Sequence, residues 1–228
     1  MSRYQLLREL GRGGCGIVWE ARDTILGRHV ALKRLRRRVG SQQAHLRREA
    51  EMVARLQHAN IITVFDLHFF RGVPSLVMEL LRGETLDRRL ARGPLAPRAA
   101  VGIALGVGMA LMHAHSQGVL HRDLKPANVG VTAEGCVKVL DFGLARLCGE
   151  ALGPGGTGTP GFMAPEQLRG DDEDERTDVY GVGALLHTMV LGVRIDAGLA
   201  RILARARAPS PARRHSSIQA LLADLLAC

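Results

Sequence analysis

The spacing of apolar residues changes character near residues 78–83 of this chain. Before that point the apolar segments are short, and His29 to Leu35 alternates aliphatic residues as a half-buried strand does. Beyond it the apolar segments have helical length, and the longest, Pro97 to Gln117, meets a stop at Gly118. Strands followed by helices predict an α+β molecule of two lobes.

The remaining segments fit the same division, and 228 residues are enough for one such domain but not for several. The further strands are expected at about residues 4–10, 17–21, 61–68 and 74–80, with a hairpin at 129–139. The further helices are expected at about residues 41–57, 87–91, 178–191, 198–206 and 217–226.

The net charge of +9 permits an anionic partner, but it does not by itself indicate nucleic acid. Aromatic residues are only 4% of the chain, and no groove-reading element accompanies the basic residues. The cysteines form no C-x-x-C pair, and we expect no signal peptide. Ala99 to Met112 is too short for a membrane span and suits a buried helix. We expect a cytoplasmic protein that binds neither nucleic acid nor membrane.

Two motifs in the first third could meet phosphate. The segment Gly11 to Val18, GRGGCGIV, places glycines where a backbone turn can approach phosphate oxygens closely, although alone it also suits an ordinary hairpin. Lys33 lies within the apolar strand VALK, and a buried lysine needs an anionic partner. Glu49 on the following charged helix is a candidate partner.

Three motifs follow in the second half of the chain. His121 to Asn128, HRDLKPAN, combines an acid that can accept a proton, a lysine that can neutralise phosphate and an amide that can bind a metal ion. Asp141 to Gly143, DFG, adds a carboxylate suited to magnesium. Gly158 to Glu166, GTPGFMAPE, closes the series.

In this order and with this spacing, the motifs closely resemble those of the eukaryotic-like serine/threonine protein kinases, especially bacterial ones. The resemblance implies one kinase domain over residues 1–228, with an N-lobe at about 1–80, a hinge at about 79–83 and a C-lobe at about 84–228. It implies an ATP- and Mg²⁺-dependent enzyme that phosphorylates Ser or Thr hydroxyls of a protein substrate, with autophosphorylation.

The resemblance also assigns roles to individual residues. Lys33, held by Glu49, would bind phosphates, Asp123 would be the catalytic base, and Lys125 would stabilise the transferred phosphoryl. Asn128 and Asp141 would bind magnesium, and Thr159 would contact the substrate hydroxyl region. The ATP-binding residues would be Leu10, Gly11, Gly13, Gly16, Val18, Ala31, Lys33, Met78, Glu79 and Leu81. Structural roles would fall to the Glu166–Arg214 ion pair, to Asp178, and to a column of Val53, Val64, His121 and Phe142, while His113 and His115 are expected to be packing or surface residues.

The chain departs from the family pattern in three places. Gly130 stands where the family has a bulky aliphatic residue under adenine, which predicts a thinner pocket floor. Thr157 is the candidate autophosphorylation site, read by Arg122, because the loop before it lacks Ser, Thr and Tyr. The segment after Leu191 is short, and most of a substrate-docking helix is expected to be missing. An ATP-binding pseudokinase scaffold and a small-molecule kinase therefore remain alternatives.

Overall fold

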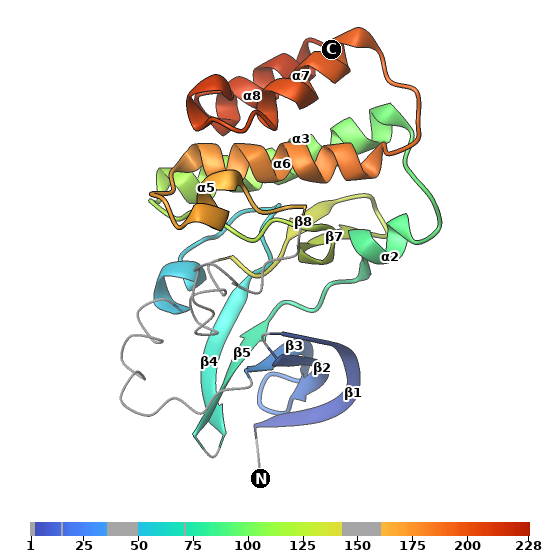
Figure 1. Ribbon diagram of the computed structural model, residues 1–228. Coiled ribbons are helices and arrows are strands. Elements are labelled where there is room, and N and C mark those ends of the chain that lie inside the picture. The colour runs from blue at the N-terminus through green and yellow to red at the C-terminus, as the bar shows by residue number, and fades with distance from the viewer. Residues whose placement is uncertain (1–2, 15, 36–49, 71, 143–160) are drawn as a thin grey trace.

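The computed structural model describes residues 3–14, 16–35, 50–70, 72–142 and 161–228. A strand-rich lobe formed by the N-terminal third lies beside a larger helical lobe, and β5 leads from one to the other (Figure 1). This confirms the predicted two-lobed α+β class.

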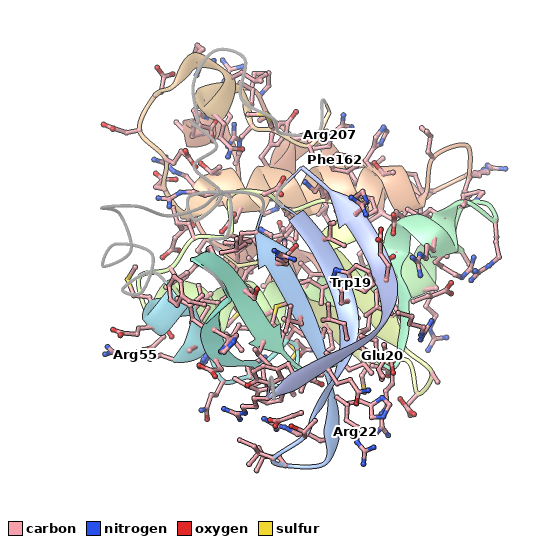
Figure 2. The ribbon with its side chains drawn as sticks, turned by 90° about the horizontal axis from the view of Figure 1, so that it is seen from below. Trp19, Glu20, Arg22, Arg55, Phe162 and Arg207 are labelled. Carbon is pink, nitrogen blue, oxygen red and sulfur yellow. The ribbon has the colours of Figure 1, made fainter. Side chains whose placement is uncertain are left out.

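The N-terminal lobe is a five-stranded antiparallel sheet with the order β1-β2-β3-β5-β4. Trp19, Glu20 and Arg22 follow one another along β2 in Figure 2. Residues 50–54, where the predicted first helix continues into the described part of the chain, are helical. The strand bounds are Tyr4–Gly13 (β1), Gly16–Asp23 (β2), Arg28–Leu35 (β3), Val64–Phe70 (β4) and Val73–Met78 (β5).

β4 begins later than the sequence predicts, because residues 60–62 hydrogen-bond to β8 (Val137–Val139) of the other lobe instead. Ile61 forms a parallel bridge with Val139, whose carbonyl accepts from the Ile62 N–H at 2.9 Å. The Asn60 side chain donates to the Val137 carbonyl at 2.8 Å. Backbone groups used in this way are not available to extend β4, and they tie the two lobes together.

The C-terminal lobe stacks helices on a small three-stranded sheet of order β6-β7-β8 (Figure 1). The sheet strands other than β8 are Gly83–Thr85 (β6) and Val129–Thr132 (β7). The helices are Leu86–Leu90 (α2), Pro97–Ser116 (α3), Pro165–Arg169 (α5), Glu175–Met189 (α6), Ala197–Ala206 (α7) and Ile218–Leu226 (α8), with 3₁₀ turns at Pro126–Asn128 (η1) and Pro211–Arg213 (η2).

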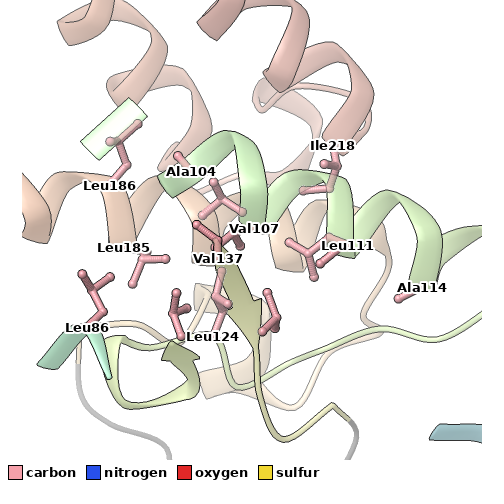
Figure 3. Close-up of a cluster of buried hydrophobic side chains, with 14 of the residues drawn as sticks. Leu86, Ala104, Val107, Leu111, Ala114, Leu124, Val137, Leu185, Leu186 and Ile218 are labelled. Carbon is pink, nitrogen blue, oxygen red and sulfur yellow. The ribbon is translucent and has the colours of Figure 1, made fainter. Parts of the chain in front are cut away.

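The core of this lobe forms around α3, which packs against α6, α8 and β8. Val107 and Leu111 of α3 are fully buried between the sheet and the other helices (Figure 3). Among the described residues, α3 is the one helix long and apolar enough to cross a membrane. Its buried residues, among them Ala104 and Ala110, belong to the core of this lobe. Glycines allow its close packing, since a Cβ on Gly108 would lie 2.3 Å from the Leu222 Cδ2 atom of α8.

The lobe is short after α6. Residues 190–196 contain no helix, and α7 begins directly after them at Ala197. Asp196 caps α7 by accepting from the Leu199 N–H at 2.8 Å, which fixes this abrupt start. The predicted shortening after Leu191 is therefore present in the fold.

Candidate active site

The loop 121–128 is anchored by one buried carboxylate of α6. Asp178 accepts hydrogen bonds from the backbone N–H groups of His121 and Arg122, both at 2.9 Å. Its Oδ2 also pairs with His115 Nε2 of α3 at 2.7 Å. Burial alone would raise the pKa of Asp178, but these contacts hold that pKa below its ordinary value. The His115 side chain is only 5% exposed, which fits the packing role that was one of the two predicted for it.

Arg122 bends the loop, with φ of +68° in the left-handed region that non-glycine residues rarely adopt. Gln167 of α5 donates to its carbonyl oxygen at 2.8 Å, which stabilises this conformation. The Arg122 guanidinium lies near an acid, with 3.2 Å between its Nε and Oε2 of Glu173. Both side chains are largely buried, so the pair is shielded from solvent. No sequence motif indicates a role for Glu173.

Asp123 is surrounded by donors from its own loop. Lys125 Nζ lies 3.0 and 2.7 Å from its two carboxylate oxygens. Asn128 Nδ2 donates to the Asp123 carbonyl at 2.8 Å and to its Oδ2 at 3.0 Å. The predicted base, the predicted phosphoryl-stabilising lysine and a predicted magnesium ligand thus lie together just before β7.

Lys33 and Asp141 come together from the two lobes. Lys33 lies on β3 with its side chain only 7% exposed, and its Nζ donates to Asp141 Oδ2 at 2.6 Å. Asp141 has φ of +59°, so its backbone leaves β8 in a left-handed turn. The buried charge of Lys33 is therefore paired with the carboxylate of Asp141. The predicted partner Glu49 lies outside the described residues.

A buried column connects the lobes beside this pair. The rings of His121 and Phe142 meet edge to face at 4.7 Å between centroids. His121 Nε2 donates to the Leu140 carbonyl at 2.9 Å, while its Nδ1 accepts from the Asp123 N–H at 3.2 Å. Val53 and Val64 are buried in the same core cluster. The ring contact confirms the His121–Phe142 part of the predicted column.

The predicted nucleotide-binding residues border the same region from the N-terminal lobe. Ala31 pairs with Met78 across β3 and β5, and both are buried. Gly11 and Gly13 stand in open space, because a Cβ on either would have no atom within 4 Å of it. Gly16 has φ of +152°, and the Arg34 carbonyl blocks the place of its Cβ. Val18, opposite Lys33 in the sheet, is half-buried.

Two contacts across this region were not foreseen from the sequence. Arg88 of α2 donates to the Leu10 carbonyl at 2.9 Å and so joins β1 to the helical lobe. Lys138 of β8 binds Glu79 Oε2 at 3.0 Å, which joins β8 to the segment after β5. Neither Arg88 nor Lys138 belongs to one of the sequence motifs, and both contacts depend on how the lobes meet.

A buried ion pair supports α5 and α6. Arg214 contacts both carboxylate oxygens of Glu166 at 2.6 and 2.7 Å, and both side chains are almost fully buried. Thr177 also donates to Glu166 at 3.0 Å. Burial by itself would raise the pKa of Glu166, but the Arg214 guanidinium holds that pKa below its ordinary value. The predicted pair is present.

The donor set around Asp123 suits a hard cation. Because Asn128 uses its amide nitrogen for Asp123, its amide oxygen is the atom that can bind a metal ion. One carboxylate oxygen of Asp141 is paired with Lys33, so its other oxygen can bind a metal ion. Two oxygen ligands fit Mg²⁺, which usually takes only one or two side chains and completes its shell with water and phosphate. Thr157, Thr159 and Gly143 lie outside the described residues.

A five-stranded sheet set on a helical lobe, with the loop 121–128 and Asp141 where they meet, is the two-lobed kinase fold. Residues 4–204 match the sequence pattern of the protein kinase domain, and the chain belongs to that family. The kinase domain of Mycobacterium tuberculosis PknI has a similar structure, with a TM-score of 0.81 and 27% identity, covering 99% of this chain and 96% of that one. A helical lobe of comparable extent thus occurs in a solved kinase domain.

Curated relatives are bacterial serine/threonine kinases. A probable serine/threonine-protein kinase of Streptomyces coelicolor is 42% identical over 83% of this chain. The serine/threonine-protein kinase PknB of Mycobacterium leprae is 39% identical over 84%. The chain spans 30% and 33% of the lengths of these two proteins.

Proposed function

We propose that this chain is a catalytic kinase domain that transfers the γ-phosphoryl group of Mg-ATP to a Ser or Thr hydroxyl of a protein. The observation that carries the proposal is that the side chains of Lys125 and Asn128 both hydrogen-bond to the Asp123 carboxylate. Lys33 and Asp141, paired across the lobes, supply the remaining charges.

The chemistry follows from where these charges lie. Asp123 orients the substrate hydroxyl and accepts its proton as the oxygen attacks the γ-phosphorus in line with the leaving β-phosphate oxygen. Lys125 neutralises charge on the transferred group, and Lys33 neutralises charge on the remaining phosphates. Bound Mg²⁺, held by Asn128 and Asp141, would supply further neutralisation of phosphate charge. Most of the rate acceleration then comes from positioning and electrostatics.

Label transfer from ATP tests this proposal. Purified protein, its Asp123→Asn variant and an Asp172→Asn control are incubated with γ-labelled ATP, Mg²⁺ and a general protein substrate. Asp172 is exposed and distant in sequence from the loop, so its variant should keep full activity. We expect Asp123→Asn to lose roughly 10²- to 10⁴-fold, with label recovered on phosphoserine or phosphothreonine. Equal transfer by wild type and Asp123→Asn, with ATP binding intact, would reject the proposal and favour a non-catalytic ATP-binding scaffold.

We also propose autophosphorylation at Thr157, read by Arg122. What supports it is the composition of residues 142–156, which offer no other hydroxyl, together with an arginine beside Asp123. Mass spectrometry of an active preparation after incubation with ATP should find phosphate on Thr157. An active preparation in which Thr157 stays unmodified would contradict this.

A further inference from the structure

Gly130 leaves no gap in the structure, contrary to the thinner floor expected from the sequence. A Cβ added to Gly130 would lie 2.6 and 2.8 Å from the two methyl carbons of Leu81. At separations below 3 Å one of the two groups must shift, so in this structure the Leu81 side chain occupies the space that a side chain at position 130 would take. Leu81 belongs to the segment that follows β5, and its side chain is half-buried.

The backbone around Leu81 is fastened to β7. Gly83 pairs with Thr132 and Thr85 pairs with Gly130 in the β6–β7 ladder. A Cβ on Gly83 would lie 2.1 Å from the Val131 carbonyl oxygen, so the chain approaches β7 as closely as only glycine permits. This contact, two residues after Leu81, fixes the position from which the leucine side chain extends.

The alternation of β7 places this contact on a defined face of the strand. Val129 is fully buried in the main core cluster, and successive residues of a strand point to opposite faces. Position 130 therefore faces away from that core, on the side where Leu81 lies. This is the face on which the family resemblance puts adenine.

We propose that Leu81 provides the apolar floor of the adenine pocket, in place of the residue at position 130. The proposal rests on the proposed function, since it requires that the chain binds ATP. Its consequence is that the floor belongs to the segment joining the lobes rather than to β7. Side-chain volume lost at position 81 can then be restored only at position 130, because side chains at the two positions would occupy the same space.

A double-mutant cycle on ATP binding tests this exchange. The Kd for ATP is measured by competition with a fluorescent ATP analogue for wild type, Leu81→Ala, Gly130→Leu and the double variant. We expect Leu81→Ala to raise the Kd about tenfold, since it removes an apolar contact. Gly130→Leu alone should weaken binding at least as much, because it clashes with Leu81. The double variant should return to within about threefold of wild type.

Folding is checked separately by circular dichroism. Leu191→Ala, the same change at an exposed leucine after α6, supplies a control that should bind ATP as wild type does. An unchanged Kd in Leu81→Ala, or effects of the two single changes that simply multiply in the double variant, would overturn the assignment of the floor while leaving ATP binding in place. Wild-type protein that binds no ATP, with Lys33→Met as the reference for lost binding, would instead overturn the proposed function and the floor with it.

Discussion

Replacing Glu166 by glutamine removes the charge that faces Arg214 inside the helical lobe. The Arg214 side chain is 0% exposed and that of Glu166 is 3% exposed, so solvent cannot compensate the arginine once its partner is neutral. Breaking a buried pair in this way costs roughly 3–5 kcal/mol. For a domain of this size each 1 kcal/mol lowers the Tm by about 2–4 °C, so the expected fall is about 6–20 °C.

Thermal and urea unfolding followed by circular dichroism measure this loss. The matched control is Arg169→Gln on the neighbouring helix α5, because Arg169 and Asp171 form a pair in which both side chains are more than half exposed. That control should change stability by less than about 1 kcal/mol. Arg214→Met should also be severe, since it leaves the carbonyls of Ala208, Arg176 and Pro209 without this donor.

The double variant Glu166→Gln/Arg214→Met should lose less stability than the sum of the two single changes, because the second change removes the charge that the first one strands. A loss below about 1 kcal/mol in Glu166→Gln, or strictly additive losses, would refute the reasoning. Either result would mean that solvent reaches Arg214 after the substitution and replaces the carboxylate.

Three further outcomes are expected. Burial, and then the nearby charges of His113 and Lys138, lower the pKa of His58, so its contribution to stability is present above pH ~6.5 and is lost as the pH falls below that value. In His58→Phe, the free energy of unfolding measured in urea should therefore depend less on pH in this range. An unchanged pH dependence would contradict this. Glu173→Gln should lower activity about threefold to tenfold, and the double variant Glu173→Gln/Thr157→Ala further, because Arg122 then loses both its acid and its proposed phosphate. Equal activity of both variants and wild type in the labelled-ATP assay would contradict this. Gly83→Ala should destabilise the protein by about 1–3 kcal/mol, because its Cβ meets the Val131 carbonyl. Gly102→Ala, on an open helical face, should stabilise it by up to about 1 kcal/mol. Changes of the same sign in the free energy of unfolding, measured in urea for both variants, would refute this contrast.

Much of the fold could be predicted because its signals are local. The strands around Lys33 and the helix from Pro97 are set by apolar spacing and by a stop at Gly118, and the structure places β3 and α3 within a residue or two of the predicted bounds. The residues of the loop 121–128 are close in sequence, so their convergence needs little information from the rest of the chain. Location in the cytoplasm stays a prediction.

The contacts that sequence reasoning missed are pairings between distant segments. Nothing near Leu81 indicates that it fills the space beside Gly130, because that depends on the register of β6 against β7. Glu173 reaches Arg122 only once α5 has docked on the loop, with Gln167 holding the Arg122 carbonyl. The predicted start of β4 was wrong for a similar reason, because residues 60–62 pair with β8 instead.

The contact of Lys125 with Asp123 bears on the order in which the two substrates of the proposed reaction would arrive. Both carboxylate oxygens of Asp123 already accept from Lys125, and one also accepts from Asn128, so an incoming hydroxyl must compete with a cation. A phosphate group placed nearby would offer that cation a stronger partner and release the carboxylate. The resting loop would therefore favour a kinetic sequence in which the nucleotide binds first and the protein hydroxyl second.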